Sequence, residues 1–183
     1  MTEHTHSNDS CCCSAEATNR RFADSLRQKA QEFLNAEGRP VAEALLTAAR
    51  AMLVANGGIT GEAGVYLLIA EAHLPLLDDD QRTVLWHFEE ALRIAEESLP
   101  ANHMALGICL SNTGETNLKL GDAEQAAADY QRAFPIIEKA LEEAEEDHMQ
   151  SYLARVLAEI VSGSKEAARA LTQSGSGDSS TGE

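Results

Sequence analysis

The chain has 183 residues, which suffices for one domain with a hydrophobic core or for a short array of repeats. Aromatic residues make up only 4% and runs of β-branched residues are nearly absent, so the composition favours helix and argues against a sheet protein. With 14 lysines and arginines against 30 aspartates and glutamates, the formal net charge is −16, which excludes the basic patch that nucleic-acid binding requires.

The excess of acidic residues favours a basic or mixed-charge protein partner, because opposite charges speed the encounter of two proteins. The charge is explained equally well as a property that keeps an alanine-rich chain soluble, and both interpretations stay open. No apolar run approaches the roughly 20 residues that span a bilayer, and the N-terminus lacks the pattern of a signal peptide. We therefore expect a cytoplasmic protein with no nucleic-acid and no membrane partner.

Residues 1–18 are polar and have no apolar period that could anchor them, so they are predicted to be a disordered tail. The tail contains ligand types that soft metals such as Zn or Cu prefer, at His4, His6, Cys11, Cys12 and Cys13. Adjacent cysteines cannot all face one ion without contorting the backbone, and structural zinc sites usually separate them by roughly two to four residues. Three interpretations stay open: a metal or metalloid site, a redox or acylation role, and an incidental tail.

From residue 19 to residue 173 the pattern is helical throughout. Pro40 suits the first turn of a helix, the run Asn56–Gly58 ends one, and the acidic run Asp78–Asp80 ends one helix and caps the next. Gly121 begins another turn. Helices are predicted near 19–36, 40–55, 62–76, 81–98, 101–119, 122–146, 148–161 and 164–173. Residues 174–183, rich in glycine and serine, are predicted to be a second disordered tail.

The sequence repeats itself with a period of 42 residues. Gly121–Ala128 aligns with Gly163–Ala170, and Ala91–Glu97 aligns with Ala133–Lys139. The same spacing aligns Ala30, Ala72, Gly114 and Val156 in a first helix, and Ala42, Val84, Ala126 and Ala168, followed by Leu46, Phe88 and Tyr130, in a second. A small residue lets the neighbouring helix approach, and the large residue a turn away fills the space beside it. One helix pair cannot bury its apolar stripe alone, so the pairs are predicted to stack.

The pattern Leu110-Ser-Asn-Thr-Gly114, followed by Gly121, Ala126 and Tyr130, resembles the helix–turn–helix signature of the tetratricopeptide repeat. The segment Ala91–His103 is similar to the linker of the long-period repeats found in kinesin light chains. This resemblance implies an all-α fold: a right-handed superhelical solenoid of antiparallel helix pairs, with three to four repeats over residues 19–173.

The resemblance also implies a concave groove, lined by the first helix of each pair, that binds a partner. At the matching positions, the residues of the partner-binding groove are Tyr66, Ile69, Ala70, His73, Ile108, Ser111, Asn112, Glu115 and Lys119, continued by Leu153, Ala154 and Leu157. The amide of Asn112 can both donate to and accept from a peptide backbone, although an exposed asparagine without a partner is an equally good interpretation. For His73 an ordinary surface histidine is the better interpretation.

The leading hypothesis is a protein–protein interaction module or adaptor that binds a partner peptide or helix in this groove. The alternative is a metal- or metalloid-binding or sensing protein that uses the N-terminal histidines and cysteines, with the solenoid as a docking scaffold. We expect no enzyme and no other cofactor, because the sequence contains no nucleophile elbow, Walker loop or dinucleotide fingerprint. Cys109 lies in an apolar helix start and is predicted to be a buried small hydrophobe.

Overall fold

The computed structural model of the protein describes the backbone of residues 9–177 and the side chains of residues 17–173. This part of the chain folds entirely into helices and turns, so the all-α prediction is confirmed. The helices are α1 (Asp9–Gln31), α2 (Arg39–Ala55), α3 (Gly61–Leu76), α4 (Gln81–Ser98), α5 (Met104–Lys119), α6 (Ala123–Glu143) and α7 (Asp147–Gly177). Over residues 9–177, none of these helices is long and apolar enough to cross a membrane.

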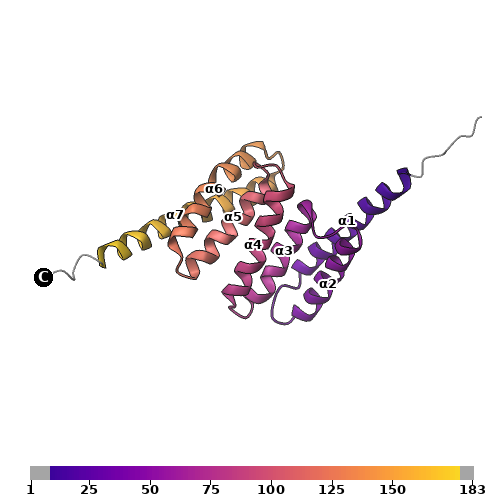
Figure 1. Cartoon of the computed structure of the whole chain (residues 1–183), viewed down its shortest axis with the longest axis horizontal. Coiled ribbons are helices and arrows are strands. Elements are labelled where there is room, and N and C mark those ends of the chain that lie inside the picture. Colours follow the sequence, from indigo (N-terminus) through magenta and orange to yellow (C-terminus); the bar gives the residue numbers. More distant parts are fainter. Residues whose placement is uncertain (1–8, 178–183) are drawn as a thin grey trace, which may run out of the picture.

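The helices pack as consecutive pairs. Each one contacts mainly the helix before it and the helix after it, and Figure 1 shows them side by side in chain order from α1 to α7. The odd-numbered helices also approach one another, α1 with α3, α3 with α5, and α5 with α7. The even-numbered helices meet only through side chains, such as Arg132 of α6 and Glu96 of α4. The odd-numbered helices therefore form one side of the molecule.

The turns inside the second and third helix pairs have the same geometry. Asp79 and, 42 residues later, Gly121 both have a positive φ, of 56° and 88°. Asp80 and Asp122 follow as N-caps with nearly identical backbone angles, and each side chain accepts a hydrogen bond from the N–H three residues further on, at 3.2 and 3.0 Å. The 42-residue spacing of the sequence is thus a spacing of the backbone as well.

The columns of the second helix that were predicted to pack are buried in the first three helix pairs: Ala42, Val84 and Ala126, with Leu46, Phe88 and Tyr130. The small residues permit close contact, as expected. A Cβ atom on Gly114 would lie 3.1 Å from the ring of Tyr130. Alternation of small and large side chains is therefore the basis of the packing.

The helices at the two ends are longer than predicted. Helix α1 begins at Asp9, so residues 9–18 of the expected disordered tail belong to its first turns. Helix α7 runs unbroken from Asp147 to Gly177, where two shorter helices and the start of a second tail were expected. Sequence patterns locate the ends of helices poorly.

Gly163 explains why the predicted turn in α7 is absent. Its Cα lies against Tyr130, and a Cβ atom at this position would come within 2.4 Å of the ring. The glycine thus serves the contact between α6 and α7 instead of a turn, and the helix continues through it. As a result the fourth copy of the repeat is out of register: Ala168 is exposed, and Ala167 takes its place in the core.

The buried side chains form two clusters that meet at α3. The larger cluster draws on α3 to α7, and the smaller one joins α1 and α2 to Leu67 and Ala70 of α3. The link between α2 and α3 contains Gly57 and Gly58, both with φ near +105° (104° and 106°), a conformation that other residues rarely adopt. The first helix pair is thus attached to the rest through one face of α3.

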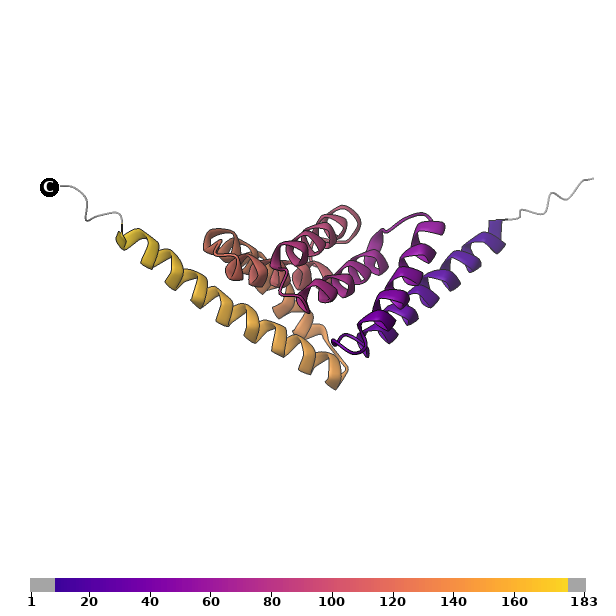
Figure 2. The same cartoon turned by 90° about the horizontal axis from the view of Figure 1, so that it is seen from below.

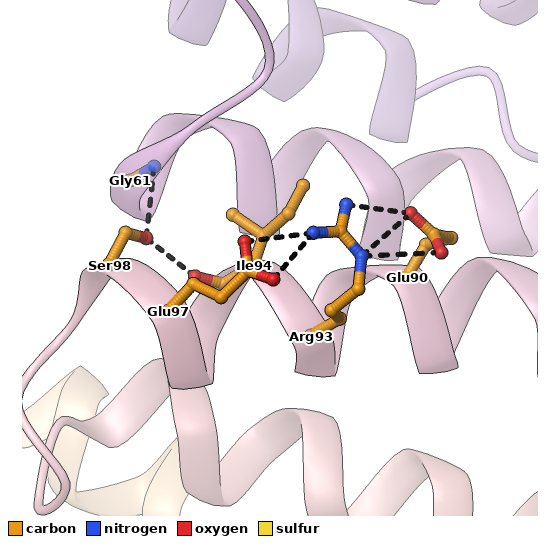
Figure 3. A network of polar contacts seen from close by, with 6 residues as sticks. All are labelled: Gly61, Glu90, Arg93, Ile94, Glu97 and Ser98. Atoms are coloured by element: carbon orange, nitrogen blue, oxygen red, sulfur yellow. Dashed lines mark hydrogen bonds and ion pairs between the residues drawn. The ribbon is translucent and has the colours of Figure 1, made fainter.

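The beginning of α3 is tied to the end of α4, as Figure 3 shows. The hydroxyl of Ser98 accepts a hydrogen bond from the N–H of Gly61 at 3.2 Å and donates one to the carbonyl of Ile94 at 2.6 Å. On the exposed face of α4, Arg93 binds the carboxylates of Glu90 and Glu97 at 3.0 and 2.8 Å. Each exposed ion pair of this kind within one helix stabilises the fold by about 0.3–0.5 kcal/mol.

Candidate protein-binding groove

A cavity of about 910 Å³, called the groove below, opens on the side that the odd-numbered helices form. Every odd-numbered helix contributes to its wall. Helix α1 contributes Arg20, Arg21, Asp24, Arg27, Gln28 and Gln31; α3 contributes Glu62, Ala63, Tyr66, Ile69 and His73; α5 contributes Met104, Ile108, Ser111 and Asn112; α7 contributes Met149, Tyr152, Arg155, Val156 and Glu159. Residues three, four or seven apart lie on one face of a helix, so each helix presents one stripe to the groove.

The structure brings six of the eight main predicted residues together in this groove: Tyr66, Ile69, His73, Ile108, Ser111 and Asn112. Glu115 and Lys119 pair with each other at 2.7 Å and line an adjoining cavity of about 370 Å³, which Ser111 also lines.

The structure corrects two further positions, since Ala70 and Leu153 are buried in the core. One residue of helix turns a side chain by about 100°, so Ala70 faces away from its neighbour Ile69. Leu157 packs against the larger cluster, while Ala154 is exposed.

Two tyrosines, each with an arginine over its ring, stand in the groove. The guanidinium of Arg27 lies 5.3 Å from the centre of the Tyr66 ring, and that of Arg155 lies 5.5 Å from the centre of the Tyr152 ring. These are cation–π distances. Burial raises the pKa of both phenols above the ordinary value, so both remain neutral hydrogen-bonding groups. A flat apolar ring with a polar end is the type of side chain that anchors protein partners.

The charge of the groove differs from that of the whole chain. Four arginines line it with three carboxylates, whereas the chain as a whole has 30 acidic residues against 14 basic ones. Arg27 pairs with Asp24 at 2.7 Å. Arg20 and Arg21 make no ion pair with any side chain that the structure describes. The groove is therefore a locally basic surface on an acidic protein.

The floor of the groove presents polar groups. The Nδ1 atom of His73 lies 2.7 Å from the carbonyl oxygen of Ile69, and because a carbonyl only accepts, Nδ1 carries the proton and Nε2 is left as an acceptor when the ring is neutral. The side-chain amide of Asn112 is half-buried and makes no hydrogen bond within the described side chains. Both residues can hydrogen-bond to a ligand, but His73 also has a structural role.

Sequence reasoning missed the wall that α1 provides and, on α7, chose Leu153, Ala154 and Leu157 in place of the lining residues Met149, Tyr152, Arg155, Val156 and Glu159. A usable signal exists in α1, where the polar side chains Arg20, Asp24, Arg27 and Gln31 recur at the spacing of one helix face. Such a stripe beside a buried apolar stripe marks a helix with two functions, packing and binding. The resemblance to the tetratricopeptide repeat assigns groove residues only from the second repeat onward, so it does not reach this stripe.

The predicted metal ligands lie largely outside the described structure. His4 and His6 precede residue 9, and Cys11, Cys12 and Cys13 lie in α1 at positions where only the backbone is described. Among the side chains from 17 to 173, no group of three or more His, Cys, Asp or Glu residues could hold a metal ion. The metal hypothesis therefore stays a prediction, which metal analysis of the reduced protein and of the variant with all three cysteines replaced by serine would test.

Cys109 is buried in α5, as predicted. Burial raises the pKa of its thiol to about 12. A buried thiol that stays protonated is a poor nucleophile at neutral pH. Its contribution is packing in the larger cluster.

No protein-family model and no curated protein matches the chain. The class of the protein is therefore defined by its structure. What the described residues define is an all-α protein of seven helices packed as consecutive pairs. The groove across the odd-numbered helices, at about 910 Å³, has more than twice the volume of the adjoining cavity of about 370 Å³.

Proposed function

We propose that the protein is a tetratricopeptide-like solenoid that acts as an interaction module, and that its groove binds a peptide or a helix of a partner protein. The observation that carries this proposal is the composition of the groove: each of the four odd-numbered helices contributes to one continuous wall. A right-handed superhelix of helix pairs presents the first helices of its pairs in this way, which is what the resemblance implies.

The charge of the groove supports a neutral or acidic segment as its ligand. Arg20 and Arg21 have no carboxylate partner among the described side chains, and an anionic group of the ligand would supply one. This differs from the basic partner that the net charge of −16 suggests. A basic segment suits the outer, acidic surface instead.

Site-specific photo-cross-linking tests the groove directly. A photoreactive phenylalanine derivative replaces exposed Gln28 in the groove and, as a matched control, exposed Glu138 on α6. We expect the first protein to form adducts with a defined partner segment in the native cell extract and the second to form none with that segment. Mass spectrometry of the adduct identifies the residues of the partner.

The identified segment then serves as a synthetic peptide for affinity measurements. Tyr66→Ala and Asn112→Ala are expected to weaken binding by tenfold or more, about 1.4 kcal/mol each, since anchors in a groove centre dominate affinity. Removal of residues 1–8 should leave the affinity unchanged. Loss of binding on that removal, with the groove variants unaffected, would overturn the proposal in favour of the tail.

A further inference from the structure

A second cavity, of about 400 Å³, lies between α2 and α4 and is called the α2–α4 cleft below. Leu46 and Thr47 of α2 form one wall, and Leu74 and Pro75 of α3 form the floor. Glu71 and Pro75 of this cleft lie on the face of α3 turned away from the groove, because each follows a groove residue, Ile69 or His73, by two positions, which correspond to a rotation of about 200°. The cleft is therefore separate from the groove.

Trp86 stands at this cleft and is the one tryptophan of the sequence. Its side chain is 54% exposed, and the edge of its ring packs against His87 with the ring centres 4.8 Å apart. An exposed tryptophan beside a cavity is unusual in a chain with few aromatic residues. Tryptophan is among the residues most enriched at the centres of protein interfaces.

The third helix pair shows what this part of the second pair lacks. In the third pair, the amide of Asn117 donates a hydrogen bond to buried Asp129 at 3.0 Å. The residues at the same positions 42 residues earlier are Pro75 and His87. Pro75 has no donor to offer, and the buried Nδ1 atom of His87 has no hydrogen-bond partner. The hydrogen bond between Asn117 and Asp129 in the third pair thus has no counterpart in the second pair, at the position of the cleft.

Two more positions distinguish the cleft from its counterpart in the next pair. Where the cleft has Trp86, the next pair has Ala128, and where the cleft has Arg50, the next pair has Leu92. Arg50 donates through Nε to a carboxylate oxygen of Glu71 at 2.7 Å, and Nη2 contacts the other oxygen. A charged pair and an exposed aromatic ring therefore replace small and apolar side chains at one site of the repeat.

The rim of the cleft is acidic. Three carboxylates lie at the cleft or in the ion pairs that adjoin it, those of Glu43, Glu71 and Asp78, against the two guanidinium groups of Arg39 and Arg50. Burial lowers the pKa of His87 below the ordinary histidine value, so the imidazole adds no positive charge at neutral pH. The local charge complements a cation.

We propose that the α2–α4 cleft is a second docking site, which takes an arginine side chain from a basic segment of a partner protein. The aliphatic part of the arginine packs on Leu74 and Pro75. The guanidinium stacks on the ring of Trp86 and binds Oε2 of Glu43, because Arg39 contacts only Oε1 of that carboxylate. This proposal is independent of the groove and gives the chain two sites of opposite charge preference on opposite faces of α3.

Intrinsic fluorescence of the full-length protein reports on this site, since all tryptophan emission comes from Trp86. The probe is a blocked hexapeptide in which arginine alternates with glycine, and the reference peptide has glutamate in place of arginine. We expect a saturable change of the emission with the first peptide and none with the second. Glu43→Gln should raise the dissociation constant by about tenfold, because a charge-assisted hydrogen bond is lost.

Two controls separate the cleft from general attraction to an acidic protein. The double substitution Glu142→Gln, Glu143→Gln removes two exposed carboxylates of α6 and should change the dissociation constant less than twofold. The double substitution Trp86→Ala, Ala128→Trp moves the indole to the equivalent position of the next helix pair, where the peptide should no longer change the emission. Circular dichroism checks that each variant is folded.

Three outcomes would overturn the proposal. The first is no saturable signal from Trp86, and the second is an equal loss of affinity in the Glu43 variant and in the α6 double variant. The third is an emission that depends on protein concentration without peptide, which would assign the cleft to a second copy of the chain. The groove variants Tyr66→Ala and Asn112→Ala should leave the titration unchanged, so a failure here is distinguishable from a failure of the groove.

Discussion

Single residues determine where one helix pair differs from the next. The repeat aligns Pro75 with Asn117 and His87 with Asp129. Asn117 donates a hydrogen bond to Asp129, whereas Pro75 has no donor, and Nδ1 of His87 makes no hydrogen bond at the α2–α4 cleft. Gly163 has a comparable effect in α7, where it permits close contact with Tyr130. In both cases the residue type was visible in the sequence, but its meaning depended on which side chain lies opposite. From the sequence we therefore predicted a turn at Gly163 and predicted no role for Pro75.

Gly163→Ala tests the close contact with Tyr130. Alanine in place of a helical glycine ordinarily stabilises a helix by about 1 kcal/mol. Here the added Cβ atom would overlap the ring, so we expect the free energy of unfolding to fall by about 1–3 kcal/mol. Urea unfolding followed by circular dichroism measures the change. In the background of Tyr130→Leu the same substitution should be neutral or stabilising, and a gain in the wild-type background would contradict the contact.

At the scale of elements, the inner helices were predictable and the outer ones were not. The bounds of α2, α3 and α4 differ from the predicted ranges by no more than one residue, because proline, glycine and aspartate mark each turn with a defined backbone role. At the outer helices the same residue types mislead, because α1 begins at Asp9 inside the predicted tail and α7 continues through Gly163 and Gly175 to Gly177. The prediction of the groove was limited in the same way: the wall from α3 and α5 was found, and the wall from α1, with Arg20 and Arg27, was missed.

The paired caps give a prediction with an internal control. Asp80→Ala and Asp122→Ala remove equivalent hydrogen bonds from backbone N–H groups at the starts of α4 and α6. In a Thr83→Ala background, which lacks the additional hydrogen bond from the Thr83 hydroxyl to Asp80, each should lower the free energy of unfolding by about 1 kcal/mol. Exposed Glu89→Ala, in the middle of α4, should change it far less. Unequal losses of unfolding free energy in the two cap variants would show that caps with the same backbone geometry stabilise the protein by different amounts.

The cap at Asp80 also predicts a pH dependence. Hydrogen bonds from the hydroxyl and the N–H of Thr83 lower the pKa of the Asp80 carboxyl below its ordinary value of 3.8. A lowered pKa in the folded state means that the stabilisation is fully present above the ordinary value and is lost as the pH falls through the lowered one. The stability difference between wild type and Asp80→Ala should thus be constant at neutral pH and shrink below pH 3.8. A difference that persists unchanged in acid would contradict an ionised cap.

At the scale of the whole molecule, the two core clusters predict unequal stability along the chain. The smaller cluster holds α1 and α2 against a single face of α3, whereas the larger one connects α3 to α7. Regions that bury fewer apolar contacts open at a lower free energy. We expect amide hydrogen exchange to be faster in α2 than in α5, which mass spectrometry of peptic fragments can measure.

A matched pair of core substitutions tests this division. Leu46→Ala and Leu110→Ala each empty a fully buried site, in the smaller and the larger cluster respectively, at an expected cost of about 2–5 kcal/mol. Leu46→Ala should accelerate exchange in α1 and α2 and leave α5 and α6 close to wild type. Uniform acceleration over all helices would mean that the chain unfolds as one cooperative unit.

The unbroken course of α7 has a practical consequence for anyone who labels or fuses this protein. The last groove residue on this helix is Glu159, and at a rise of about 1.5 Å per residue the axis continues for about 27 Å to Gly177. Figure 2 shows this part of α7 extending beyond the other helices at the end of the molecule opposite to α1. The helix is a rigid spacer, and a fluorophore or surface tether placed after Gly177 would be held well clear of a ligand in the groove.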